Sequence, residues 1–255
     1  VFPGGRVDDG DRRMVATATQ ASTSVRVLLD ERNSGNPRAS MLEVALSPGA
    51  NTSLAQADRL ELWYIIDGGA EVAGAAAGYT AVTSGDALWV APGAYRRWKS
   101  QTGMRAVVVV TPGGPEGVAR AGALPGKGVY SDVDGRGLPG PVVLFARDAQ
   151  TATAAQRSVR FAIDPKRGGP AGAALSVLEL VGSVPEHAHA TETELLYVMA
   201  GEGTMTADGV ELPVTRDTVV QVPPTVKHSF VGTGTLRALQ FYVPGGPEQR
   251  FKVSP

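Results

Sequence analysis

The chain of 255 residues repeats one set of sequence blocks in the same order. The stretch TATQASTSVRVLLDERNSGNP from Thr17 resembles TATAAQRSVRFAIDPKRGGP from Thr151. Three further pairs follow at a nearly constant separation: ELWYIIDG (61–68) with ELLYVMAG (194–201), GDALWVAPGAYRR (85–97) with RDTVVQVPPTVKH (216–228), and TPGGPE (111–116) with VPGGPE (243–248). Because four blocks keep their register, we interpret the chain as two copies of one domain, not as a solenoid.

The repeated blocks are typical of β-strands. Gly (32) and Pro (18) separate short runs rich in Val, Leu, Thr and Tyr, each of strand length. Examples are SVRVLLD (24–30), LELWYIID (60–67), RAVVVVTP (105–112), LSVLELVG (175–182) and ELLYVMAG (194–201). Runs with helical spacing are scarce, and the best helix candidate is the Ala/Gln/Thr stretch near 148–157. The pattern predicts an all-β fold built from many short strands.

The Gly/Pro-rich stretch GALPGKGVYSDVDGRGLPGP divides the two copies. We therefore expect an N-terminal domain over 1–121, a linker over 122–141 and a C-terminal domain over 142–255. The formal net charge of −1 offers no broad basic face, so nucleic acid and membrane surfaces are not expected partners. The compartment stays open: cytoplasmic, or exported if a leader preceded Val1.

Two of the three histidines stand one residue apart in PEHAHATETELLY (185–197). On a strand, His187 and His189 would point to the same face. A turn at ATET would let Glu194 open the next strand, and His228 can return on a neighbouring one. Three neutral imidazoles and one carboxylate suit a first-row divalent metal. Glu192 is the competing carboxylate, which we interpret as a solvated loop residue.

These residues resemble the two motifs of the cupin family. The first motif reads G182-SVPE-H187-A-H189-ATET-E194-LLYVMA-G201, with the family's His-x-His, four-residue gap, Glu and six-residue gap to Gly. The second is RDTVVQVPPTVKH (216–228), in which Asp217, Pro223 and His228 match while Arg216 and Thr225 replace two glycines. The resemblance covers both copies and implies a bicupin, which is two tandem jelly-roll β-barrels in one chain.

By this resemblance, the C-terminal barrel binds one divalent transition metal ion (Mn, Fe, Ni or Zn) through His187, His189, Glu194 and His228. In the N-terminal copy, the same template keeps Glu61 but places Leu54, Gln56 and Arg97 where the histidines would be. Leucine cannot ligate and arginine repels a cation, so this barrel is expected to hold no metal. Two hypotheses compete there: a pocket for an anionic or aromatic ligand built from Glu61, Trp63 and Arg97, with Arg97 paired to Glu61, or a packed scaffold, which we favour.

The residues do not decide between two kinds of function. The first is a metal-dependent enzyme acting on a small organic acid or aromatic molecule, of oxygenase or isomerase/lyase type, with aminohydrolases as a further class that the resemblance allows. The alternative is a non-catalytic cupin that binds a metal or small ligand as a sensor or storage protein. Strand alternation from Glu194 sends Leu196 and Val198 toward the metal, which predicts a mostly apolar pocket. Gln240 and Tyr242 share one face of the last strand. We also expect a homodimer, formed through the polar leading segment 1–13.

Overall fold

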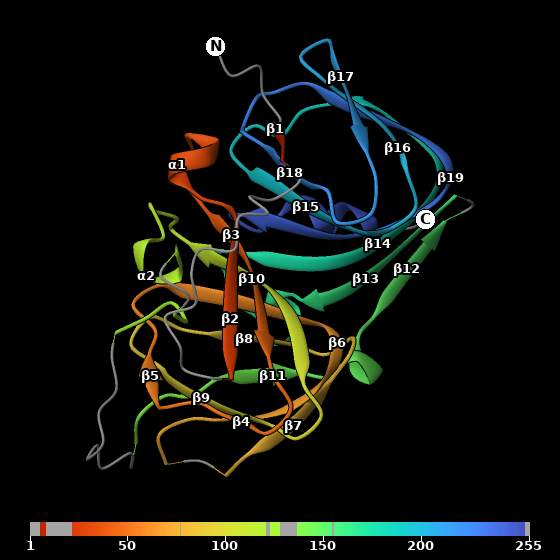
Figure 1. Cartoon of the computed structure of the whole chain (residues 1–255). Coiled ribbons are helices and arrows are strands. Elements are labelled where there is room, and N and C mark those ends of the chain that lie inside the picture. The colour runs from red at the N-terminus through yellow and green to blue at the C-terminus, as the bar shows by residue number, and fades with distance from the viewer. Residues whose placement is uncertain are drawn as a thin grey trace. The chain divides into compact units, whose positions relative to one another are not determined.

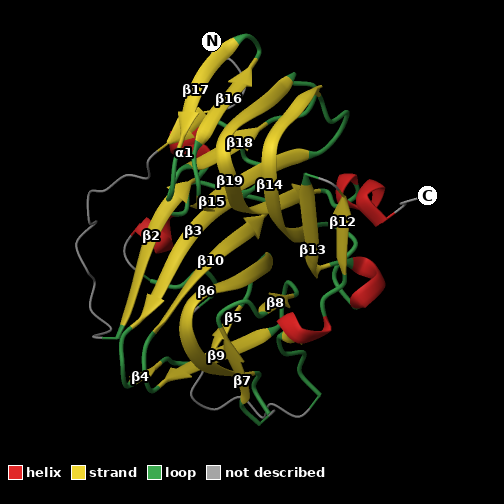
Figure 2. Ribbon diagram, turned by 90° about the vertical axis from the view of Figure 1, so that its right-hand side faces the viewer, coloured by secondary structure: helices red, strands yellow, loops and turns green. Residues whose placement is uncertain are grey.

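The computed structural model describes residues 6–8, 22–76, 78–120, 123–127, 137–154 and 156–252. Strands dominate the described chain, and its helices are short (Figure 2). The predicted all-β fold is confirmed, with curled sheets of the jelly-roll type. The helix expected near 148–157 is wrong, because Thr151–Ala154 forms a strand whose residues pair with Arg157–Arg160. No helix in the described part of the chain has the length and apolar character to cross a membrane.

Packing divides the chain into two compact units, residues 11–148 and residues 149–255 together with 1–10. The first unit contains β2 Thr23–Leu29, α1 Glu31–Ser34, β3 Ser40–Leu46, β4 Ala50–Asn51, β5 Ala55–Gln56, β6 Leu60–Ala73, β7 Thr80–Thr83, β8 Ala87–Val90, β9 Tyr95–Ser100, β10 Met104–Thr111, α2 Gly117–Arg120, β11 Val142–Leu144 and the 3-10 turn η1 Ala146–Asp148. Its main strand order is β11-β8-β6-β10-β3-β2, with β9 joining β4, β5 and β6, and β7 joining β6.

The second unit repeats this topology (Figure 1). It contains β1 Arg6–Asp8, β12 Thr151–Ala154, β13 Arg157–Ile163, η2 Pro165–Arg167, β14 Ala174–His187, β15 Thr193–Ala200, β16 Gly203–Ala207, β17 Val210–Val214, β18 Val219–Val222, β19 His228–Val243 and η3 Pro247–Lys252. Its strand order is β1-β18-β15-β19-β14-β13-β12, and β16 joins β17 and β19. The central trio β15-β19-β14 corresponds to β6-β10-β3 of the first unit, as the repeat predicts.

The edge strands come from unexpected parts of the sequence. β11 precedes the second repeat but pairs with β8 in the first unit, and β1 precedes the first repeat but pairs with β18 in the second. The strand pairing therefore groups residues 142–144 with the N-terminal unit. The domain limits expected at 121, 122–141 and 142 remain a prediction, because half of that linker lies outside the described residues, as does most of segment 1–13.

Strand alternation turns one set of side chains in each unit toward an interior apolar cluster, while the central strands β10, β15 and β18 are buried on both faces. In β9, Arg96, Trp98 and Ser100 are buried, whereas Tyr95 and Arg97 are half-buried. In the second unit, the inward residues of β14, β15, β18 and β19 form one apolar cluster that includes Leu178, Leu180, Leu196, Val198, Val220, Phe230 and Leu236. The candidate site lies beside this cluster.

Two turns in each unit need a left-handed backbone. Gly85 (φ 95°) and Gly93 (φ 81°) fill these positions in the first unit, and Asp217 (φ 66°) and Thr225 (φ 68°) fill them in the second. Gly85 and Asp217 are separated along the chain by the same interval as Gly93 and Thr225. Asp217 thus stands where the motif has its glycine, and the expectation that Arg216 replaces that glycine is wrong by one position. Sequence alone hid the shift because Asp tolerates this conformation better than most residues.

Thr218 then occupies the position of the motif aspartate. Asp86 accepts a hydrogen bond from the backbone N–H of Thr83 at 2.9 Å in the first unit. Thr218 Oγ1 accepts one from the backbone N–H of Thr215 at 3.0 Å in the second. The two turns are therefore closed by equivalent hydrogen bonds, in which the acceptor is a carboxylate in the first unit and a hydroxyl in the second. The turn at Thr218 leads into β18, which pairs with β15 beside Glu194.

Candidate metal centre

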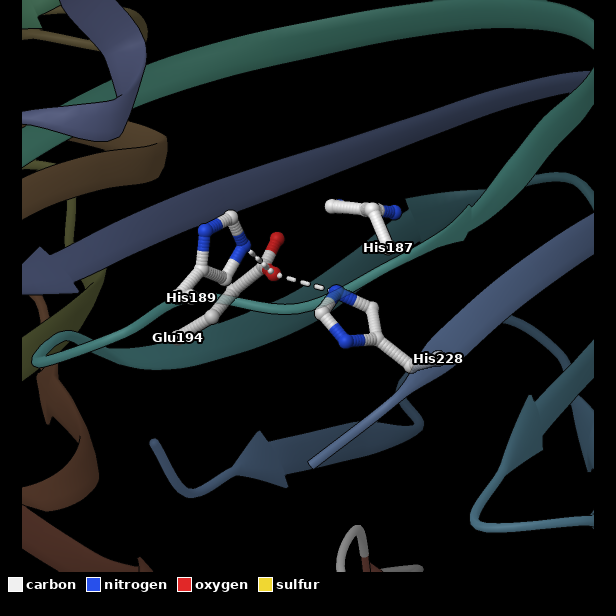
Figure 3. A group of neighbouring side chains, drawn as sticks. All are labelled: His187, His189, Glu194 and His228. Carbon is white, nitrogen blue, oxygen red and sulfur yellow. Dashed lines mark hydrogen bonds and ion pairs between the residues drawn. The ribbon is translucent and has the colours of Figure 1, made fainter. Parts of the chain in front are cut away.

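Four side chains from three strands and a connecting loop converge on one point. His187 ends β14 and lies opposite His228, the first residue of β19, in the antiparallel ladder. His189 follows β14 in the connecting loop, and Glu194 is the second residue of β15. Their four candidate ligand atoms lie within 4.8 Å of one another, and His189, Glu194 and His228 are buried while His187 is half-buried. Figure 3 shows the imidazoles of His189 and His228 directed at the Glu194 carboxylate.

The separations suit one ion. Glu194 Oε2 is 3.0 Å from His189 Nε2 and 3.1 Å from His228 Nε2. With metal–ligand bonds of about 2.0–2.2 Å, two ligand atoms at right angles lie about 3 Å apart. The donor set of three nitrogens and one oxygen leaves two positions open if the geometry is octahedral. These residues therefore fit a divalent transition metal ion, whose identity the donor set does not determine.

The outer ring nitrogens of two histidines are held by backbone carbonyls. His187 Nδ1 is 2.9 Å from Pro185 O, and His228 Nδ1 is 3.1 Å from Val226 O. With a metal bound, each of these rings would carry its hydrogen on Nδ1, donate it to the carbonyl and present the Nε2 lone pair to the ion. The turn residue Thr225 donates its backbone N–H to the carbonyl of His189 at 2.7 Å, which ties the loop to the second motif.

Glu194 is oriented by the last strand. Gln240 Nε2 donates to Glu194 Oε1 at 2.6 Å, and the Tyr242 hydroxyl lies 3.4 Å from the same oxygen. Gln240 and Tyr242 therefore lie on the face of β19 that is directed at the site. The sequence predicted that they share a face but not which one. The two bonds fix Oε1 and leave Oε2 facing the imidazoles. Glu192 lies outside the cluster and accepts a bond from the backbone N–H of Thr191 at 3.2 Å.

The electrostatics keep the carboxylate ionised. Burial alone would raise the pKa of Glu194, but the hydrogen bonds from His189, His228 and Gln240 outweigh burial and hold its pKa far below the ordinary value. Burial lowers the pKa of His187 and so favours the neutral, ligating form. Burial also acts to lower the pKa of His228, but the Glu194 carboxylate raises it more strongly. Protons would therefore compete with a metal most strongly at His228.

The cluster opens into a cavity of about 390 Å³. The walls include Leu196 and Val198, as strand alternation from Glu194 predicts. The remaining apolar lining residues are Leu178, Leu180, Val184, Pro185, Met205, Val214, Val220, Phe230, Leu236 and Phe251. Two arginines, Arg157 and Arg250, line the same cavity. Neither arginine could be found from the sequence, because both lie outside the two histidine motifs and no spacing connects them to the motifs.

The equivalent positions of the first unit hold no ligands. Val90 lies opposite Glu61 as Val222 lies opposite Glu194, which aligns the two units at this point. Ala55 pairs with Arg96 as His187 pairs with His228. The histidine positions are therefore Ala55, Ala57 and Arg96, and the predicted Leu54, Gln56 and Arg97 are each wrong by one position. For Leu54 and Gln56 the cause is the loop before the glutamate, which has three residues after Ala57 but four after His189. For Arg97 the cause is the one-position shift already described, in which Asp217 and not Arg216 corresponds to Gly85.

The first unit satisfies its buried glutamate with protein donors. Arg96 Nε is 2.6 Å from Glu61 Oε2 and Nη2 is 2.8 Å from Oε1, a bidentate pair that is wholly buried. Trp63 Nε1 donates to Glu61 Oε2 at 2.8 Å. Arg96 also donates to the carbonyl of Pro125. The expected ion pair between Arg97 and Glu61 is wrong, because strand alternation turns Arg96 inward and Arg97 away.

Arg97 lies elsewhere. Its guanidinium carbon is 5.1 Å from the centroid of the Tyr79 ring, beside Lys99, whose Nζ is 4.1 Å from the same ring. Glu61 and Trp63 are buried in the packed interior with Trp98, whose ring centroid is 4.9 Å from that of Trp63. The described contacts thus favour a packed scaffold at Glu61 over a ligand pocket.

Comparisons with known proteins agree with this geometry. A family profile described as Cupin domain matches residues 175–243. No curated protein sequence matches the chain. Among solved structures, a tryptophan-to-tyrosine variant of oxalate decarboxylase from Bacillus subtilis is similar with a TM-score of 0.75 at 14% identity, covering 100% of this chain and 82% of that one.

Two further structures of that enzyme are similar to the same degree. One, described by the fine-structure parameters of its Mn(II) centres, has a TM-score of 0.74 at 14% identity and the same coverage. The other, determined at pH 4.6, has a TM-score of 0.73 at 15% identity, covering 100% of this chain and 81% of that one. Identities this low establish the fold alone. The family profile, the jelly-roll topology and the His/His/Glu/His cluster together support a cupin domain over residues 175–243 of the second unit.

Proposed function

We propose that the chain is a bicupin metalloenzyme, in which the second unit holds one divalent ion on His187, His189, Glu194 and His228. The observation that carries the proposal is the convergence of four ligand atoms within 4.8 Å at the wall of a cavity of small-molecule size. When bound, such an ion would polarise a carbonyl or carboxylate oxygen of a small organic substrate.

The chain's own residues would have defined roles. Gln240 and Tyr242 hold the Glu194 carboxylate in place, and the Pro185 and Val226 carbonyls hold two imidazole rings. The apolar walls at Leu196 and Val198 would exclude water and contact the body of the substrate. The reaction class that we propose is oxygenase or isomerase/lyase, on a small organic acid or aromatic molecule. The similar fold of oxalate decarboxylase is compatible with this class.

One observation favours the second candidate, a non-catalytic metal- or ligand-binding cupin. Gln240 and Tyr242 both contact the carboxylate of Glu194 and so orient a residue that we propose as a metal ligand. Neither contact identifies a general acid or base for a reaction. The two candidates share the metal site and differ in whether a bound organic molecule is converted.

The test is turnover by metal-loaded protein. Purified chain would be loaded with Mn(II), Fe(II), Ni(II) or Zn(II) and incubated with a panel of small organic and aromatic acids, with product analysis by mass spectrometry. We expect conversion that disappears in His228→Ala. Stoichiometric metal binding without conversion of any panel member would favour the binding protein, and failure to bind a metal would contradict both candidates.

A further inference from the structure

The cavity at the metal centre has a second charged region. Arg157, the first residue of β13, and Arg250, in η3, line the same cavity as His187 and Glu194. Both guanidiniums lie over one ring, with their carbons 4.3 Å and 5.0 Å from the centroid of Phe251. The ring thus gathers two positive charges at the wall of a largely apolar cavity.

Neither arginine forms an ion pair with a carboxylate of the described residues. Among the described residues, no carboxylate lies within 4.0 Å of either guanidinium. Glu186 also lines the cavity, but its carboxylate is exposed and lies 3.7 Å from Lys227 Nζ. Two like charges held on one ring repel each other, and an anion between them would relieve that repulsion. The planar guanidinium of an arginine can donate two parallel hydrogen bonds to one carboxylate.

The rest of the cavity favours an apolar body. Its other walls are the aliphatic and aromatic residues already named, and its volume of about 390 Å³ lies near the lower end of small-molecule pockets. Against these walls, away from the metal ligands, a second charged group on the ligand would be desolvated without a partner, which is unfavourable. A carboxylate that carries no apolar body would leave the walls unfilled.

We infer that the second unit takes a small monocarboxylate with an aromatic or branched apolar body, whose carboxylate binds Arg157 and Arg250. Its body packs between Phe251 and the wall at Leu196, and its other end faces the metal ligands. The C-terminal segment Pro247–Lys252 is then part of the substrate site. The inference rests on the proposed function, to which it adds the substrate class and two specificity-determining residues.

Isothermal titration calorimetry on the full chain loaded with Mn(II) tests the inference with three probes. Benzoate carries both the charge and the body, acetate the charge alone, and benzamide the body alone. We expect benzoate to bind at least about tenfold more tightly than either of the others, since hydrogen bonds to charged groups are among the stronger ones. Arg157→Gln and Arg250→Gln should each weaken benzoate by about tenfold or more and leave benzamide unchanged.

Arg216→Gln is the matched control, because it removes one exposed arginine of the same unit that does not line the cavity. Equal affinities for benzoate and benzamide, no binding of benzoate, or an effect of Arg216→Gln as large as that of the cavity variants would overturn the inference. Metal content is measured on the same samples. Absent metal in wild type would contradict the proposed function, whereas full metal with no arginine dependence would contradict this inference alone.

Discussion

Glu61 and Glu194 occupy the same position in the two units, each followed by six residues and a left-handed glycine, and differ in what surrounds them. Glu194 is bordered by imidazoles and an amide, and Glu61 by a guanidinium and an indole. A buried carboxylate has to be compensated in either case. In the first unit, the guanidinium of Arg96 compensates the charge of Glu61. In the second unit, the imidazoles of His189 and His228 lie beside Glu194 and could bind an added metal ion together with it. The comparison explains how one fold can serve as a scaffold and as a metal site.

Removing His228 should produce the largest functional effect. His228→Ala deletes one of four proposed ligands, so metal affinity should fall by more than the roughly 100-fold that loss of an outer contact can cause. Competition with a chromophoric chelator measures this affinity. Wild-type affinity in His228→Ala would contradict the assignment of the centre.

Removing Arg96 should produce the largest effect on stability. Arg96→Ala leaves the buried Glu61 charge without its partner, which is expected to lower the free energy of unfolding by about 3–5 kcal/mol. Metal stoichiometry should not change. The double variant Glu61→Leu/Arg96→Met removes both charges and should be more stable than Arg96→Ala. Chemical denaturation measures both, and a double variant no more stable than the single one would argue against a buried ion pair as the cause.

Gln240 should affect the metal affinity of the site although it is not a proposed ligand. Gln240→Leu removes the donor to Glu194 Oε1 and should weaken metal binding by about 10–100-fold. Gln221→Leu is the control, since Gln221 is equally buried on β18 and its amide nitrogen has no partner among the described residues. The same chelator competition applies. Equal affinities in the two variants would mean that Gln240 does not orient Glu194.

Arg97 should matter least. Arg97→Ala removes a contact with the Tyr79 ring, and the expected loss of stability is about 0.5–1 kcal/mol. Metal content and any metal-dependent turnover should stay at the wild-type level. A loss of stability as large as that of Arg96→Ala would contradict the assignment of Arg96 as the buried partner of Glu61 and of Arg97 as the residue that faces away.

The sequence predicted the fold and the four converging residues because both depend on local spacing. The strands follow from alternation and turn residues, and His187, His189, Glu194 and His228 follow from a motif with fixed gaps. The first unit was harder to predict, since a loop shorter by a single residue displaced the two positions counted back through it, and a one-position shift in the second motif displaced the third. Arg96 and Arg97 are chemically identical, and the buried Trp98 two positions after Arg96 was the available signal. Arg157 and Arg250 depend on tertiary packing, which spacing does not encode.

The central claim is that the second unit binds a metal and the first does not. Elemental analysis of the purified full chain, before and after the double substitution His187→Ala/His189→Ala, tests this most directly. We expect about one equivalent of a divalent transition metal per chain in wild type and almost none in the double variant. Two equivalents in wild type, or an unchanged equivalent in a folded double variant, would contradict the account.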